Sequence, residues 1–265
     1  MYDAKLVRWN TYDPMAEKYY GINPYVYCVG DPVNMVDSYG SEIRGLTKKD
    51  IKSFREDLFT VLSGDKFENI RSLIDIKGLS LKKIDTDKLN SAMDALSLTE
   101  DESAYISMIA FAINSNAIYK VEYVSGDYVS IEGSTVFVNY MSEYWGKQTA
   151  EGFVDSDGML SSAFIKSLGN GLNVPTRNGS YSFIFQETKE KDPQYLLYRA
   201  LTSGHEVFGH GIPAEMKLNK ADNNANAIRA DNLIRRLLGF PQRDGSDHNG
   251  YRQGHIINPY SLPIR

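Results

Sequence analysis

Two of the chain's four histidines flank a glutamate in residues 204–211, which read GHEVFGHG. Two imidazoles on one helical turn can hold Zn²⁺, and a carboxylate beside them can take a proton from water held by the metal. The usual spacing of such a pair is four residues, whereas His205 and His210 are five apart. Five positions turn a regular helix by about 140°, so the two imidazoles would diverge. The stretch therefore predicts a zinc site with a π-bulge, for which Gly209 and Gly211 supply backbone freedom. The alternative is a polar helix end with two incidental histidines.

A catalytic zinc needs a third protein ligand and one open position. The candidate acids after the second histidine are Glu215, Asp222, Asp231, Asp244 and Asp247. Residues 223–238, closed by Gly239, predict an amphipathic helix, and Asp231 borders its apolar stripe. An acid at the edge of a buried face needs a partner, and a cation is a natural one. Asp231 is therefore the expected third ligand, with an ion pair to Arg235 as the alternative. Asp222 is better explained as the N-cap of this helix.

A polar tail, residues 242–251, follows the predicted ligand helix. In it, either His248 or Tyr251 could stabilise the oxyanion of a tetrahedral intermediate. The alternative is a solvated loop with a spare histidine. The remaining histidine, His255, is interpreted as structural.

These residues together suggest a zinc-dependent peptidase. His205, His210 and Asp231 would hold Zn²⁺, and Glu206 would act as the general base. Two other classes stay open. One is a non-catalytic module in which metal or hydrogen bonds only staple the C-terminal helices. The other is a toxin of different hydrolase chemistry, such as a nuclease that uses His248 and nearby acids.

These residues must be positioned by helices and strands, and the sequence patterns predict an α+β fold with a helical N-terminal half. Thr47 caps an apolar-periodic run that Gly64 stops, a shorter helix spans 67–74, and another follows Asp85. Thr99 and Glu102 form a capping box for a fourth helix.

The hydrophobic period then changes to two, which predicts strands at 118–124, 128–140 and 181–187 in a small antiparallel sheet. Residues 141–180 are interpreted as loops, and Asp155-Ser156-Asp157-Gly158 as a turn. Pro193 starts the predicted metal-binding helix.

Composition narrows the class of protein. The chain has 265 residues, of which 42% are hydrophobic and 24% charged, so it is long and apolar enough to bury a core. Its net charge of −5 disfavours binding to nucleic acid or to an anionic membrane. Its single cysteine, Cys28, excludes internal disulfides. No apolar run approaches the ~18 residues needed to span a bilayer, and no secretion signal follows Met1.

Residues 1–45 differ from the rest, being rich in Tyr, Pro, Asn and Gly. Their aromatic runs, separated by Asp-Pro and Asn-Pro turns, predict short strands that cannot form a core alone and must pack on the main domain. Four motifs distinguish this segment: Tyr2-Asp3-Ala4 with Arg8-Trp9, the run DPMAEKY from Asp13, NPYVYC from Asn23 and DPVNMVD from Asp31. On these motifs, the segment resembles the end of the RHS repeat-associated core domain of large bacterial surface and secreted proteins.

That resemblance implies a shell-forming core followed directly by a variable toxin domain. Many members cut themselves at aspartates in paired DPxG motifs. Asp13 and Asp37 fall at those positions, where this sequence reads DPMA and DSYG. The implied organisation is a core remnant at 1–45 and an effector domain at 46–265. Delivery as part of a larger RHS protein, secreted or carried into a target cell, and a cognate immunity protein follow as expectations.

The histidine motif is similar to the HExxGH of the dipeptidyl-peptidase III type of zinc peptidase, which has the same extra residue. A ligand on a second, downstream helix resembles the gluzincin peptidases, where that ligand is usually glutamate. The helix and its polar tail are similar to metallopeptidase toxin domains attached to RHS cores. These resemblances imply a zincin-like fold, Zn²⁺ as cofactor and a protein or peptide substrate.

Overall fold

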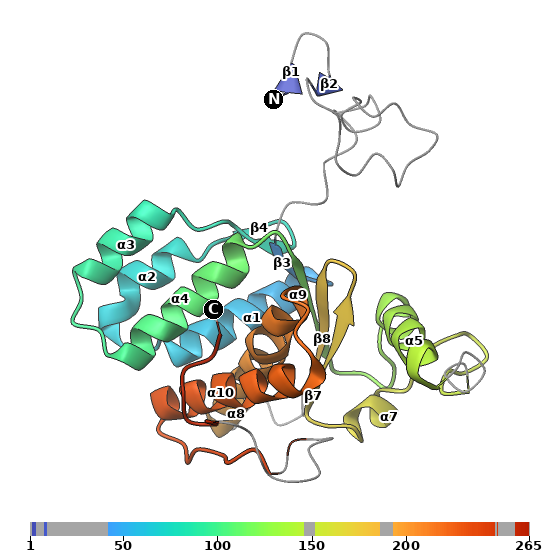
Figure 1. Ribbon diagram of the computed structural model, residues 1–265. Helices are drawn as coiled ribbons and strands as arrows, with labels where there is room; N and C mark the ends of the chain where they lie inside the picture. Colours follow the sequence, from blue (N-terminus) through green and yellow to red (C-terminus); the bar gives the residue numbers. More distant parts are fainter. Residues whose placement is uncertain are drawn as a thin grey trace. The chain divides into compact units, whose positions relative to one another are not determined.

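The computed structural model describes residues 2–3, 8–9, 42–145, 152–185, 193–246, 248 and 258–264. The chain divides into two compact units, Met1–Gly40 and Ser41–Arg265 (Figure 1). In the first unit β1 (Tyr2–Asp3) pairs antiparallel with β2 (Arg8–Trp9). The two aspartates of the proposed self-cleavage motifs, Asp13 and Asp37, lie outside the described residues.

The second unit is built on a six-stranded sheet of order β4-β5-β3-β6-β8-β7. Its strands are β3 (Glu42–Gly45), β4 (Ile76–Lys77), β5 (Ser80–Leu81), β6 (Ile118–Val124), β7 (Gly171–Thr176) and β8 (Gly179–Phe185). The central strands β3, β6 and β8 run parallel, and the outer pairs are antiparallel. The prediction of an antiparallel sheet is therefore wrong. Helices connect the central strands, and such crossovers return a chain in the same direction.

The helices before β6 follow their sequence signals. They are α1 (Lys48–Val61), the 3₁₀ turn η3 (Asp65–Phe67), α2 (Glu68–Leu73), α3 (Thr86–Asp94) and α4 (Glu100–Asn114). Thr47 forms a reciprocal capping box with Asp50, and Thr99 forms one with Glu102. Each box satisfies backbone donors that the first helical turn leaves unpaired, so these starts are fixed locally.

The predicted strand at 128–140 is instead a helix, α5 (Ile131–Trp145). The Ser130 hydroxyl accepts a hydrogen bond from the Gly133 backbone at 2.9 Å, as an N-cap does. Phe137 and Met141, four residues apart, are both buried. Packing on one helical face therefore overrides the β-propensity of the segment.

The segment 141–180, predicted as loops, also holds α7 (Ser162–Lys166) and the edge strand β7. The turn at Asp155 forms as predicted: its carboxylate accepts from the backbone of Asp157 and Met159, and Gly158 has a φ of +75°.

The C-terminal part supplies α8 (Pro193–Gly204), the π-helix η4 (His205–Gly211), α9 (Ile212–Glu215) and α10 (Lys220–Leu238). Gly239 ends α10 in a left-handed conformation, as predicted. The N-cap is Asn219 rather than Asp222, since the Asn219 side chain accepts from the Asp222 backbone at 3.0 Å. The helix thus begins one turn earlier than the sequence pattern indicates.

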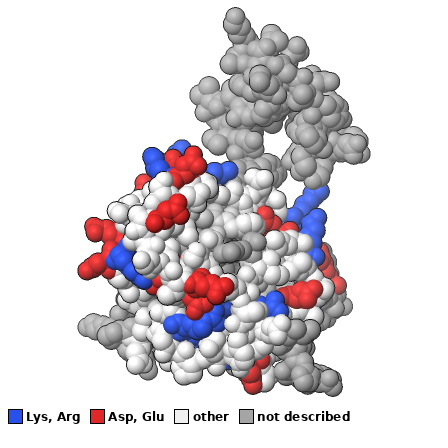
Figure 2. Space-filling view, turned by 60° about the vertical axis from the view of Figure 1, so that its left-hand side comes forward, with Lys and Arg blue, Asp and Glu red and all other residues white. Residues whose placement is uncertain are grey.

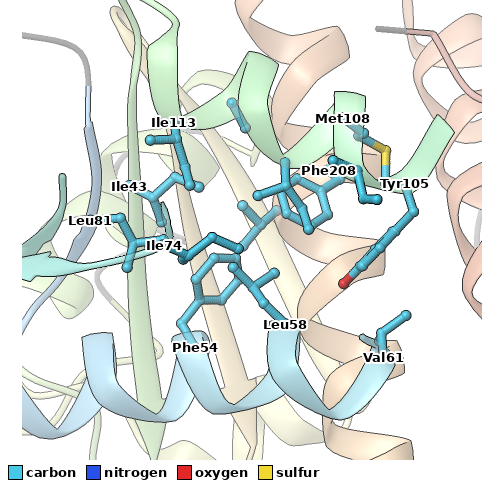
Figure 3. Close-up of a cluster of buried hydrophobic side chains, with 14 of the residues drawn as sticks. Ile43, Phe54, Leu58, Val61, Ile74, Leu81, Tyr105, Met108, Ile113 and Phe208 are labelled. Atoms are coloured by element: carbon cyan, nitrogen blue, oxygen red, sulfur yellow. The ribbon is translucent and has the colours of Figure 1, made fainter. Parts of the chain in front are cut away.

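Two apolar cores lie on the two faces of the sheet. Along β8, Ile184 joins the core with the N-terminal helices, α8 and α10, while Tyr181 and Phe183 join the core with α5 and α7 (Figure 1). Phe208 of the π-helix reaches the first core, with its ring 5.9 Å from Phe54 and 6.2 Å from Tyr105 (Figure 3). The π-helix is thereby anchored to the interior of the unit.

On the face drawn in Figure 2, acidic and basic side chains are interspersed among the coloured residues, and no continuous basic area is visible. None of the helices that the structure describes is both long and apolar enough to cross a membrane.

Candidate metal centre

The histidine motif lies in the π-helix that continues α8, and this confirms the irregularity expected from its spacing. The wider turn brings His205 and His210 together, with ring centroids 5.0 Å apart. Both side chains are half-buried. The extra residue in the motif therefore lets two imidazoles five positions apart share one side of the helix.

Glycines of this segment allow a close approach of its neighbours. A Cβ at Gly209 would lie 2.8 Å from the Ala227 Cα of α10, and one at Gly211 would lie 2.9 Å from the Ser180 Oγ of β8. Side chains at these two positions would push α10 and β8 away from the π-helix. The glycines therefore hold the histidines between the sheet and α10.

The third member of the cluster is His248. Its ring centroid lies 5.2 Å from that of His205 and 5.2 Å from that of His210, so the three rings form a nearly equilateral triangle. One potential ligand atom from each of the three lies within 4.8 Å of the others. In the described part of the chain this is the set of side chains that could hold a metal ion, and Asp231 is not in it.

The tautomer of His210 is set by Asn223 on α10. The Asn223 amide nitrogen donates to the His210 carbonyl at 3.1 Å, which identifies the other end of the amide as the oxygen. That oxygen contacts His210 Nδ1 and can only accept, so Nδ1 carries the proton. His210 Nε2 is then left with the lone pair that a metal requires.

The charge state of the histidines also suits a metal. Burial lowers the pKa of His205 well below its ordinary value, with a smaller contribution from the neighbouring imidazoles, and burial lowers the pKa of His210. Both rings are therefore neutral near pH 7, the form that binds metal. His205 Nδ1 is buried and has no hydrogen-bond partner among the described residues, so it is a polar atom that a ligand would satisfy.

Glu206 follows the first histidine and is 6% exposed. No described residue donates a hydrogen bond to its carboxylate, whose side chain lies against β7: a Cβ at Gly171 would be 2.7 Å from Glu206 Cγ. Burial, and after it the Asp231 carboxylate, raises the pKa of Glu206 to about 8. A carboxyl with a pKa near neutrality can both accept and return a proton.

Asp231 is fully buried and lies in the same cleft, where its Oδ2 pairs with two arginines and its buried Oδ1 accepts no hydrogen bond from the described residues. Its Oδ2 accepts from Arg235 Nε at 2.9 Å and from Arg243 Nη1 at 3.0 Å. The ion pair with Arg235, the alternative expected from the sequence, is thus present. Asp231 is thus ion-paired with two arginines, and His248, not Asp231, is the residue that clusters with His205 and His210.

The cluster opens into a cleft of about 1150 Å³. Its walls include β7 and the residues before it, the end of α8, the π-helix and the start of α10. Asn173 of β7 ties the strand to the π-helix, because its amide donates to the Glu206 carbonyl at 3.1 Å. The general-base candidate therefore lies between the histidines and an edge strand.

The sequence-derived site is thus partly assembled. The structure brings His205, Glu206, His210 and His248 together, and it gives His248 the position of a ligand rather than that of an oxyanion donor. Tyr251 and His255 lie outside the described residues. The sequence interpretation missed Asn223. The scarcity of histidine in the chain was a usable signal for His248, since three of the four histidines meet here.

No protein-family model, curated protein or solved structure matched this chain.

Proposed function

We propose that the Ser41–Arg265 unit is a zinc-dependent peptidase with a zincin-like site on a mixed α/β fold. The observation that carries this proposal is the convergence of three imidazoles beside a buried, unpaired glutamate in a cleft. The three ligands would be His205, His210 and His248. Three protein ligands leave one coordination position open, which is typical of catalytic rather than structural zinc sites.

The fit to Zn²⁺ rests on the donor set. Three neutral imidazoles are ligands that zinc accepts, and hard cations such as Mg²⁺ and Ca²⁺ prefer oxygen. When bound, the ion would polarise a substrate carbonyl and make water more acidic.

Glu206 is the proposed general base. Its carboxylate has no protein partner among the described residues, so it is free to take a proton from the attacking water and to pass it to the leaving amine. The Gly171 backbone and the Asn173 hydrogen bond hold the π-helix and β7 together, which fixes the carboxylate in the cleft.

A peptide substrate is favoured by the strand beside the histidines. β7 lies at the end of the strand order, lines the cleft and, among the described strands, pairs with β8 alone. An edge strand offers main-chain donors and acceptors to an extended chain, and this mode of binding tolerates many side chains.

The biological setting is carried by the resemblance of the first 40 residues to the end of an RHS core. On that basis the peptidase would be the effector domain of an RHS-type polymorphic toxin, delivered by the larger protein. A producing cell would then need an immunity protein that covers the cleft.

The test combines metal analysis with peptide hydrolysis. We expect the purified chain to hold about one zinc ion per molecule, to lose peptide hydrolysis on chelation and to regain it when zinc is added. Glu206→Gln keeps the shape of the side chain and removes the base, so hydrolysis should fall by about 10²- to 10⁴-fold with zinc retained. Full hydrolysis by this variant would contradict the mechanism.

The same experiment distinguishes an enzyme from a non-catalytic domain in which the metal only cross-links the C-terminal helices. A staple would hold zinc and gain thermal stability from it, but it would hydrolyse no peptide with or without the Glu206 carboxylate.

A further inference from the structure

The cleft is lined by many more cations than anions. Among its described lining residues the cations are Lys166, Arg199, Lys217, Lys220, Arg235 and Arg243, and the acids are Glu206 and Asp231. The whole chain carries a net charge of −5, so the cleft has the opposite sign to the protein around it. A cleft of one sign concentrates substrates of the other.

Part of this positive charge has a structural counter-charge. Arg199 donates to Asp57 at 2.6 Å and to Glu56 at 2.5 Å. Arg235 and Arg243 both form ion pairs with the carboxylate of Asp231. These ion pairs hold the three arginines in place, so their guanidinium groups are engaged by acids of the protein itself.

Lys217 and Lys220 are different, because neither forms an ion pair with any described residue. Both are exposed at the connection between α9 and α10. Lys217 has a φ of +55°, an uncommon conformation for a residue other than glycine. The connection therefore holds two uncommitted cations at the rim of the cleft.

Their place relative to the histidines follows from α10. Lys220 and Asn223 are three residues apart on this helix, so their side chains share one face. Asn223 hydrogen-bonds His210, and Lys220 and Lys217 line the same cleft. Both lysines therefore line the part of the cleft formed by the start of α10, where Asn223 contacts His210.

We propose that this cleft selects acidic peptides, and that Lys217 and Lys220 bind a substrate carboxylate on the His210 side of the scissile bond. The proposal rests on the peptidase function above. The carboxylate has two possible sources, an acidic side chain and a free C-terminus. Both would be attracted by the same cations, and they differ in whether capping the peptide removes the effect.

The test uses the zinc-loaded full chain and pairs of peptides that differ only by Glu against Gln beside the cleaved bond, with blocked ends. We expect wild-type kcat/KM to be about 2- to 30-fold higher for the Glu peptide, because its carboxylate forms two partly solvated ion pairs that the Gln peptide lacks. Lys217→Ala/Lys220→Ala should remove most of that preference, as should raising the salt concentration. A third peptide, with Gln and a free C-terminus, identifies a terminal carboxylate as the source if it alone is favoured.

The matched control is Lys48→Ala/Lys49→Ala, which removes the same charge from exposed positions on α1 outside this cleft. It should leave the Glu-to-Gln ratio unchanged. No preference for the Glu peptide in the wild type would overturn the acidic selectivity. A preference that is equally strong in the wild type and in Lys217→Ala/Lys220→Ala would overturn the role of the two lysines. Either result leaves the peptidase function intact.

A second measurement does not depend on turnover. Binding of the same peptides to the zinc-loaded Glu206→Gln chain, followed by calorimetry, should show the same preference for the Glu peptide and its loss in the lysine double variant. Tighter binding of the Gln peptide would refute the inference. Absence of zinc-dependent hydrolysis by the wild type, with the binding preference present, would instead refute the peptidase function alone.

Discussion

Glu206 and Asp231 are two buried carboxylates in one cleft, and their surroundings differ completely. Asp231 on α10 accepts hydrogen bonds from two arginines. Glu206 on the π-helix accepts none from the described residues and has its pKa raised to about 8 by burial and by Asp231. Removing one partner of a buried ion pair is costly because the other charge is left buried and unpaired, whereas a buried carboxyl with a strongly raised pKa is a common feature of functional sites.

The difference predicts opposite effects of removing each carboxylate on stability. Asp231→Ala leaves Arg235 and Arg243 without their shared partner and should lower the free energy of unfolding by about 3–5 kcal/mol. Glu206→Gln removes a buried acid that lacks a partner, so it should be neutral or stabilising in metal-free protein. Urea unfolding of the chelated proteins measures both. Equal destabilisation by the two changes would remove the distinction between the acids.

The raised pKa of Glu206 gives the comparison a pH dependence. The ordinary value is 4.5 and the folded value about 8, so between these the folded state binds the extra proton. The free energy of unfolding of metal-free protein should therefore fall as the pH rises from about 4.5 to 8, by up to about 1.4 kcal/mol per pH unit from this group. Glu206→Gln should lack that component. The difference between the two stability curves isolates it from the histidines, and parallel curves would contradict the assignment.

Asn223 is an uncharged residue of the cleft that supports a proposed metal ligand, His210, through hydrogen bonds. If it fixes the His210 tautomer, Asn223→Ala should weaken zinc binding by about 10- to 100-fold, as is typical of residues that support metal ligands. Competition with a chelating dye gives the affinity. Asn219→Ala, which removes the N-cap of the same helix, is the control for a general loss of α10 stability and should affect zinc binding less.

The smallest expected effect is at Gly171. A methyl group there would lie 2.7 Å from Glu206 Cγ and 2.8 Å from its Oε1, so Gly171→Ala should displace the carboxylate. We expect kcat to fall by about tenfold with zinc content unchanged, because a displaced base is less well aligned. Gly126→Ala is a suitable control, since a Cβ there meets no atom within 4 Å. An unchanged kcat in Gly171→Ala would show that the position of Glu206 is not critical.

Local signals in the sequence predicted the elements that they control. The N-cap at Thr47, the capping box at Thr99, the glycine end of α10 and the extra residue of the histidine motif all act within a few positions, and each forms as expected. The parallel pairing of β3, β6 and β8 depends on packing between distant segments, which periodicity does not encode. β7 was missed because glycine, asparagine and proline disfavour strands, although an edge position tolerates Pro175.

The site shows the same division. His205, Glu206 and His210 could be predicted because they are neighbours in the sequence. His248 is 38 residues beyond His210, and only the fold brings it to the other two. Arg235 and Arg243 supply the cations that a buried acid needs, so the burial of Asp231 does not by itself indicate a metal ligand.

The most direct test of this account is the zinc content of His248→Ala set against that of Asp231→Asn. Both variants would be purified under the same conditions, checked for folding by circular dichroism and assayed by elemental analysis. A three-histidine site predicts that His248→Ala loses stoichiometric zinc, whereas folded Asp231→Asn retains about one ion per chain. Zinc retained by His248→Ala and lost by folded Asp231→Asn would contradict the site and return the third ligand to α10.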